Sequence, residues 1–252
     1  SHKELKGRCS GYKWSSGTYT KYGDHGTHVA TTIAAKRTGS GGMVGVAPNV
    51  KIYAYAYFDD NGSLGSTAEA SMIDHARKKG VRVINMSYGP IAKGKLAEFS
   101  SLREMGKAKN KYVVFVKSAG NDGVKLINLV FADNFSAQKK LKNLIIVGAV
   151  DKNLKLTSWS NRPGHGCFKA VNDATCKKKN KYKYFFVVAP GQSIYAGIAN
   201  GGYASKQGTS MAAPHVTGVV AQLQRYWPVL KKRTGSVANI IFHTAQDLGA
   251  KG

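Results

Sequence analysis

The chain has 252 residues, of which 38 are Lys or Arg and 13 are Asp or Glu, so its formal net charge is +25. Because 42% of the residues are hydrophobic and fall in clustered runs, the composition excludes a disordered polycation. The count of 3 Cys excludes a small disulfide-bonded protein, and the lack of a Gly repeat excludes a collagen-like one. The longest apolar runs, 144–150 and 184–189, are far shorter than the roughly 20 residues of a membrane-spanning helix, and we expect no transmembrane segment.

Apolar, β-branched runs alternate with helical patterns between residues 44 and 189. This alternation predicts an α/β fold with three layers, in which a mostly parallel central sheet is covered by helices on both faces. No internal repeat and no linker rich in Pro, Gly or Ser divides the chain, so we expect a single domain over residues 1–252. Helices are expected at 24–35, 67–79, 96–109 and from 209 onward, and strands at 51–58, 81–86, 112–116, 144–149 and 185–189.

Three short motifs supply the parts of a nucleophilic reaction. His25 opens a helix beside a glycine, where an exposed imidazole with a pKa near neutrality can accept a proton. Asn121 follows the expected strand 112–116 and can direct its amide into the crevice at the carboxyl edge of a parallel sheet. Ser210 follows a Gly-led turn into a helix, whose positive end stabilises developing negative charge. A base, an oxyanion donor and a nucleophile together indicate acyl transfer.

The residues around these positions resemble the subtilisin-like serine peptidases, the subtilase family, in segments 25–30, 119–121 and 208–215. The resemblance implies a subtilisin-like fold and a serine endopeptidase that hydrolyses peptide bonds through an acyl-enzyme on Ser210. It also implies that His25 is the general base and that Asn121 belongs to the oxyanion hole. Ser87, Tyr88 and Gly89 resemble the segment whose backbone pairs with an extended peptide or protein substrate.

One part of the subtilase pattern cannot be found, the Asp that fixes the tautomer and orientation of the imidazole. Asp24 is adjacent to His25 and lies on the wrong side to hold its ring, and residues 1–5 resemble the segment that directly follows the Asp in the family. Since 244–249 resembles a late segment of the family, we expect the chain to be trimmed at both ends. The alternative hypothesis is a catalytically inactive subtilase domain that serves as a binding or maturation module.

No metal or other cofactor is expected. Loop 36–44 stands where the family binds calcium tightly, but it offers no carboxylate or side-chain amide. His25 and His28 lack a third zinc ligand of fitting type nearby, so we expect His28, like His215, to have a structural role. The basic, Gly-rich loop is similar to that of subtilases carried by bacterial autotransporters, which implies a secreted or bacterial cell-surface protein.

The basic residues lie in short blocks scattered along the chain, which favours solvated helix faces and loops. We expect no specific nucleic-acid partner, although the net charge favours attraction to anionic surfaces. A third hypothesis is a polyanion-binding protein. Binding that weakens steeply as the salt concentration rises would support it. Cys167 and Cys176 bracket a loop of suitable length for a disulfide, but their pairing is left open, as is the state of Cys9.

Overall fold

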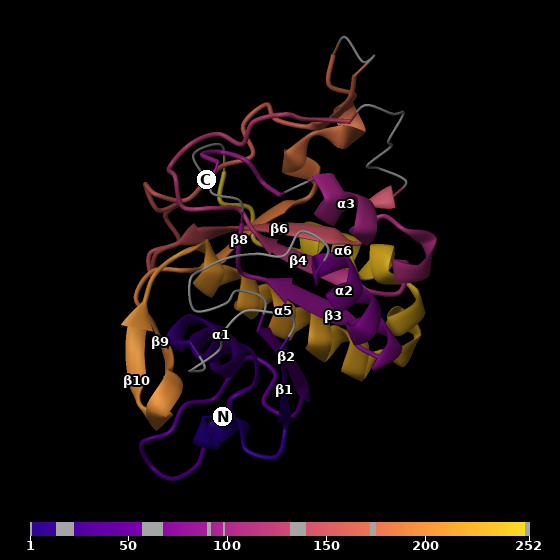
Figure 1. The fold of residues 1–252 in the computed structure, drawn as a ribbon. Helices are drawn as coiled ribbons and strands as arrows, with labels where there is room; N and C mark the ends of the chain where they lie inside the picture. Colours follow the sequence, from indigo (N-terminus) through magenta and orange to yellow (C-terminus); the bar gives the residue numbers. More distant parts are fainter. Residues whose placement is uncertain are drawn as a thin grey trace.

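The computed structural model describes residues 2–13, 23–56, 68–89, 92–97, 99–131, 140–171 and 175–249 (Figure 1). Its central sheet is parallel and has the strand order β3-β4-β6-β8. The two inner strands are buried along their whole length, as a sheet covered on both faces requires. The four strands are β3 (Val83–Met86), β4 (Val114–Ser118), β6 (Leu144–Val150) and β8 (Phe186–Pro190).

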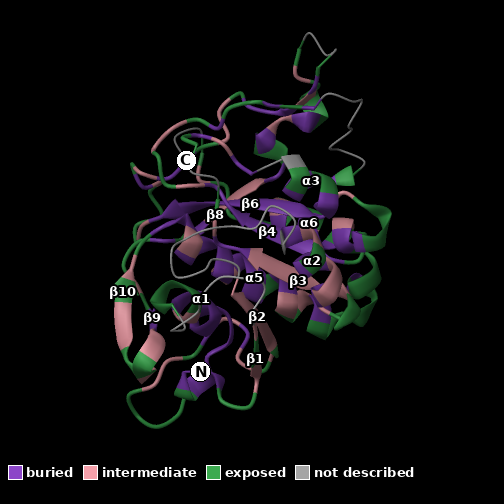
Figure 2. Ribbon diagram, viewed as in Figure 1, coloured by how far each residue is buried: buried purple, intermediate pink, exposed green. Residues whose placement is uncertain are grey.

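Helices cover both faces of this sheet, which confirms the predicted three-layer α/β fold (Figures 1 and 2). Helices α2 (Ala68–Lys78) and α3 (Phe99–Met105) contribute Ile73 and Leu102 to the core on one face. On the other face, α5 (Thr209–Tyr226) and α6 (Thr234–Thr244) pack Val216 and Val237 against the apolar side chains of β4 and β6. Helix α5 contacts all four strands of the sheet.

Some of the predicted elements differ from the structure in position or pairing. A strand was predicted at 51–58 within the central sheet, but β2 (Ile52–Ala56) instead forms a separate two-stranded parallel sheet with β1 (Cys9–Lys13). Strand β1 was not predicted from the sequence. Residues 57 and 58 lie outside the described part of the chain. The predicted strand 112–116 begins two residues later because a 3₁₀ turn at Ala108–Asn110 and its continuation occupy the chain before it.

The remaining elements are α1, two further two-stranded sheets and short 3₁₀ helices. Helix α1 (Asp24–Ala34) packs against α5 and against the antiparallel hairpin β9 (Ile194–Gly197) and β10 (Tyr203–Lys206). A second parallel pair consists of β5 (Leu129–Phe131) and β7 (Phe168–Ala170). Short 3₁₀ helices occur at Lys3–Leu5, Lys178–Asn180, Tyr182–Tyr184, Ala199–Gly201 and Pro228–Lys232.

A disulfide joins Cys167 to Cys176, with their Cα atoms 6.1 Å apart, and thereby answers the question that the sequence left open. Cys9, on β1, is a free thiol. Burial raises the pKa of this thiol, which disfavours its reactive thiolate form. Within the described part of the chain, no helix has the length and apolar character needed to cross a bilayer.

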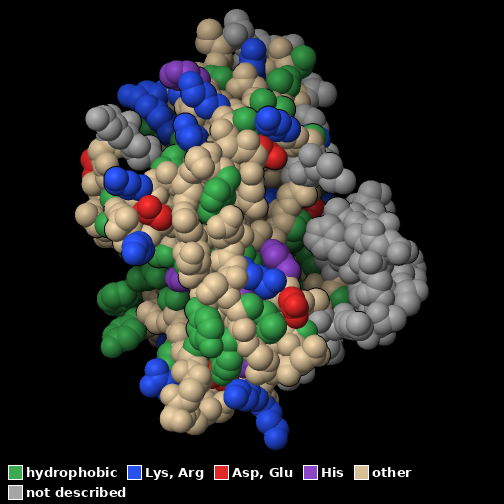
Figure 3. Space-filling view, turned by 90° about the vertical axis from the view of Figure 1, so that its left-hand side faces the viewer, with side chains coloured by type: hydrophobic (Ala, Val, Ile, Leu, Met, Phe, Trp, Pro, Cys, Tyr) green, Lys and Arg blue, Asp and Glu red, His purple; other side chains and the backbone are tan. Residues whose placement is uncertain are grey.

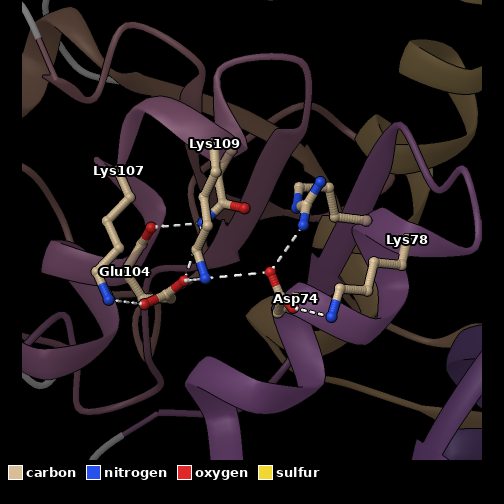
Figure 4. A network of polar contacts seen from close by, with 7 residues as sticks. Asp74, Lys78, Glu104, Lys107 and Lys109 are labelled. Carbon is tan, nitrogen blue, oxygen red and sulfur yellow. Dashed lines mark hydrogen bonds and ion pairs between the residues drawn. The ribbon is translucent and has the colours of Figure 1, made fainter.

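A network of ion pairs joins α2 to the end of α3 and the turn after it (Figure 4). The Asp74 carboxylate contacts Arg77 at 2.9 Å, Lys78 at 3.0 Å and Lys109 at 3.1 Å. Lys109 also contacts Glu104, the carboxylate of which is almost completely buried. Hydrogen bonds from its three basic partners lower the pKa of Asp74. For Glu104, burial alone would raise the pKa, but hydrogen bonds from Lys107, Lys109 and Asn110 outweigh it and lower the value.

We expect Asp74→Asn to lower the free energy of unfolding at pH 7 by about 1 kcal/mol, since the pairs are partly exposed to solvent. A carboxylate with a lowered folded-state pKa stabilises the fold above its unfolded pKa, near 4, and loses this contribution as pH falls through the folded value. The difference between variant and wild type should therefore shrink at pH 3. Urea unfolding at both pH values measures it, with Asp247→Asn as a control outside the network; an equal difference at both would contradict the interpretation.

Candidate active site

His25 lies in the first turn of α1, and the helix is anchored one turn later by His28. The His28 ring is fully buried, and its Nε2–H group lies 2.9 Å from the carbonyl oxygen of Ile194 and 3.1 Å from that of Ala204. Because both acceptors belong to the β9–β10 hairpin, this contact fixes α1 against it. His28 is thus a structural residue, as expected, and His215, whose Nδ1 bonds the Met211 carbonyl within α5 at 2.8 Å, is another.

The His25 imidazole has the protonation behaviour that a general base needs. Partial shielding from water lowers its pKa below the usual value, and the charges of His28 and Lys206 act in the same direction. The ring is therefore neutral at pH 7 and able to accept a proton. Among the described residues, no hydrogen bond joins His25 to Ser210. The neighbouring carboxylate of Asp24 accepts the Ala199 N–H at 3.0 Å, so it serves the turn after β9.

Ser210 is the second residue of α5 and follows Gly208, which has φ of +145°, a conformation that side-chain-bearing residues rarely adopt. Its hydroxyl donates to the Ser87 carbonyl at 3.2 Å, and the Ser87 hydroxyl donates to the Ser210 carbonyl at 2.8 Å. Asn85 extends this connection by donating to the Ser87 hydroxyl at 2.9 Å. These bonds fix the start of α5 to the segment after β3. The Ser210 hydroxyl must rotate away from the Ser87 carbonyl before it can donate its hydrogen bond to a base.

Asn121 is held beside Ser210 by a residue that the sequence analysis did not single out. The Asn121 Oδ1 accepts the Thr209 backbone N–H at 2.8 Å and the Thr209 hydroxyl at 2.9 Å. The Thr209 hydroxyl in turn accepts the Gly120 N–H at 3.0 Å. With its oxygen engaged in this way, the Asn121 amide keeps its NH₂ group for another acceptor. The position of Thr209 directly before Ser210 in the same motif was the available signal.

A cavity of about 280 Å³ lies at the carboxyl ends of β3 and β4, between the two segments just described. The structure therefore brings Ser210, Asn121, Tyr88 and Gly89 together, with Ser87 bonded to Ser210 behind them. His25 is not among the lining residues, although its helix packs through Val29 and Ala30 onto the start of α5. The cavity is lined by Tyr88, Gly89, Lys95, Leu96, Lys117, Ser118, Ala119, Gly120, Asn121, Asp122, Thr209 and Ser210.

This arrangement can support nucleophilic attack by Ser210 on a carbonyl group placed at the mouth of the cavity. The Ser210 backbone N–H has no partner among the described residues and belongs to the first turn of α5, where helix N–H groups are unpaired. Together with the Asn121 amide it provides two donors for a developing oxyanion. Within the same described ranges, no three His, Cys, Asp or Glu side chains are grouped so as to bind a metal ion.

Comparison with known proteins connects this geometry to one family. The family model described as the subtilase family matches residues 2–252. Subtilisin DY of Bacillus licheniformis is 34% identical over 251 residues, which are 99% of this chain and 80% of that protein. The thermophilic serine proteinase of Bacillus sp. (strain AK1) is 34% identical over 225 residues, which are 88% of this chain but only 48% of that proteinase.

Solved structures agree with the fold. Sphericase matches with a TM-score of 0.70 and 28% identity, over 97% of this chain and 79% of its own. Patellamide maturation protease PatA matches with a TM-score of 0.74 and 23% identity, over 99% and 84% of the respective chains, a likeness that concerns the fold alone.

Proposed function

The chain belongs to the subtilase family, and on this premise we propose that it is a serine endopeptidase in which Ser210 is the nucleophile, His25 the general base and Asn121 an oxyanion donor. The observation that supports these roles most directly is the fixed arrangement of Thr209, Ser210 and Asn121 at the mouth of the cavity. The His25 helix packs against the same end of α5.

In the proposed reaction, the Ser210 oxygen attacks the substrate carbonyl carbon while its proton passes to His25. The negative charge on the carbonyl oxygen is stabilised by the Asn121 amide and the Ser210 N–H. When the tetrahedral intermediate collapses, the C–N bond breaks, and His25 gives its proton to the departing amine. Water then attacks the acyl-enzyme, His25 accepts and returns one proton, and the acid product leaves Ser210 free. We place the extended substrate along Ser87, Tyr88 and Gly89 by resemblance to the family.

A fluorophosphonate probe tests the proposal, because it labels a serine only when the serine is activated. The full-length protein from its natural source is treated with the probe, and the adduct is mapped by peptide mass spectrometry. Labelling at Ser210 that is lost in His25→Ala is the expected result. It would also mean that the natural protein supplies a group that orients His25, a role that Asp24 does not fill here.

The opposite result would favour the alternative, a catalytically inactive subtilase domain that acts as a binding or maturation module. This alternative rests on a specific observation, the absence of a carboxylate contact to His25 within the described residues. Folded protein that shows no labelling at Ser210 would overturn the enzymatic proposal.

We further propose that the protein acts outside the cytoplasm, at the cell surface or after secretion. The Cys167–Cys176 disulfide supports this proposal because disulfides persist in oxidising compartments. The basic loop 36–44 supports, by resemblance alone, a place among autotransporter-associated subtilases. Lys and Arg side chains are spread over the face seen in Figure 3, with few acidic ones between them, so we propose a general attraction to anionic surfaces rather than a specific nucleic-acid site.

A further inference from the structure

Lys117 is a buried charged residue for which the proposed reaction gives no explanation. It lies on β4 directly after the apolar residues 114–116, and only 2% of its surface is exposed. Burying an ammonium group is costly unless the group is paired. Among the described residues, however, no carboxylate lies within ion-pair distance of Lys117.

The neighbours of the Lys117 ammonium are neutral oxygen atoms. Its Nζ donates to the Ser118 carbonyl at 3.2 Å, to the Ser118 hydroxyl at 3.4 Å and to the Tyr88 carbonyl, and it lies 5.5 Å from the centre of the Tyr88 ring. A Cβ atom built on Gly89 would be 3.6 Å from Nζ, so the absence of a side chain there leaves space beside the ammonium. Tyr88, Gly89 and Ser118 all line the cavity next to Ser210, as Lys117 itself does.

The acidic residues nearby are occupied by other donors. Glu69, whose charge acts on Lys117 from a distance, accepts the Tyr88 hydroxyl at 2.7 Å and also the Ser101 hydroxyl. Asp122 lines the cavity, but its Oδ2 accepts Asn161 Nδ2 at 2.9 Å and the Gly94 N–H at 3.0 Å. A second lysine, Lys95, lines the cavity as well. The wall of the cavity thus carries two lysines against one aspartate that is already hydrogen-bonded.

We propose that Lys117 makes this cavity selective for an acidic side chain, so that the chain prefers Glu or Asp at the substrate residue whose carbonyl is attacked. The proposal rests on the proposed function for the identity of the reacting bond. A substrate carboxylate that reaches the ammonium gains a charge-assisted hydrogen bond in a buried site, whereas a neutral amide of the same shape gains less and a basic side chain is repelled. Lys117 is here a specificity-determining residue and takes no part in the proton transfers.

The preference should depend on pH in a defined direction. Burial lowers the pKa of Lys117 to about 7, and the charge of Glu69 opposes the shift only in part. The ammonium is therefore present below about pH 7 and lost above it. Among the residues that the structure describes, the other charged groups that face the cavity or Lys117 are Lys95, Asp122 and Glu69. Hydrogen bonds from Asn161 and Gly94 lower the pKa of Asp122, so its charge is constant in this range. Selectivity for a carboxylate should accordingly be greater at pH 6 than at pH 8.

Peptides that differ only by Glu or Gln at the selective position give the sharpest test. For the active protein, we expect kcat/KM at pH 6 to be about 10-fold higher for the Glu peptide. This ratio should fall toward 1 at pH 8 and also in Lys117→Met and Lys117→Gln, while thermal unfolding confirms that both variants are folded. Lys231→Met, which removes one exposed positive charge from the 3₁₀ helix after α5, controls for attraction by net charge and should keep the ratio. A ratio near 1 in the wild-type protein at pH 6 would overturn the proposal.

Binding measured without cleavage separates this proposal from the proposed function. In a Ser210→Ala background, fluorescence anisotropy should show about 10-fold tighter binding of the Glu peptide than of the Gln peptide, and Lys117→Met should abolish the difference. Equal affinity for the two peptides would show that Lys117 only supports the Tyr88 segment. If the fluorophosphonate probe fails to label Ser210 but the Glu preference in binding persists, the endopeptidase proposal fails and the acidic selectivity stands.

Discussion

Replacing Ser210 with Ala should lower kcat for peptide hydrolysis by about 10⁶, the largest effect expected of any single substitution in this chain. His25→Ala should cost about as much, because a serine hydroxyl without its base and a base without its nucleophile are equally unproductive. The double variant should lose little beyond either single variant, since the two groups act as one unit. Steady-state hydrolysis of a peptide substrate by the natural full-length protein measures all three.

His28→Gln provides the contrasting case, because His28 holds α1 on the hairpin and takes no direct part in the reaction. We expect it to lower the unfolding temperature, with far less loss of kcat in the fraction that stays folded. If Ser210→Ala retained more than a thousandth of wild-type activity, the assignment of the nucleophile would be wrong.

Asn121→Ala should lower kcat by a factor of about 10² to 10³, with little change in KM, because the lost hydrogen bond forms only when charge develops on the substrate oxygen. The fold should tolerate the change, as Asn121 is exposed and lies at the cavity mouth. Single-turnover kinetics with the natural protein would separate the chemical step from substrate binding.

Thr209 supplies the matched pair for this experiment. Thr209→Val removes the hydroxyl that bonds Asn121 and Gly120, whereas Thr209→Ser keeps it. We expect Thr209→Val to lower kcat by about 10-fold to 10²-fold, through misplacement of the amide, and Thr209→Ser to restore most of the activity. An Asn121→Ala variant in which KM rises and kcat is unchanged would show that Asn121 binds substrate rather than the oxyanion.

The parts of the fold that were predicted well are those whose local pattern decides their structure. Strand β6 was predicted within one residue because seven apolar or small residues lie between Asn143 and Asp151. Strand β4 ended later than predicted because Lys117 and Ser118 are polar yet continue the sheet. The composition of β1 gives no apolar alternation, and only its pairing with β2 makes it a strand.

The candidate site divides in a similar way. Ser210 and Asn121 could be identified from the sequence because each lies in a distinctive local motif, and the structure places both at one cavity. Thr209 and Lys117 gain their importance only from segments that are far apart in the chain. Thr209 contacts Gly120 and Asn121 across 88 or more residues, and the cavity beside Lys117 requires β3, β4 and α5 to meet. Such relations are properties of the tertiary structure and leave no pattern in a single sequence.

Ser210 and His25, the proposed nucleophile and base, are attached to parts of the fold that differ in how firmly they are held. Ser210 lies in the first turn of α5, which contacts every strand of the central sheet, whereas the principal contacts of α1 are with α5, the hairpin and β2. Local unfolding begins in regions that make fewer contacts with the core. Mild heating should therefore release α1, and His25 with it, while amide hydrogens of α5 still resist exchange. Loss of activity then begins as a separation of base from nucleophile that cooling reverses, well before the sheet itself unfolds.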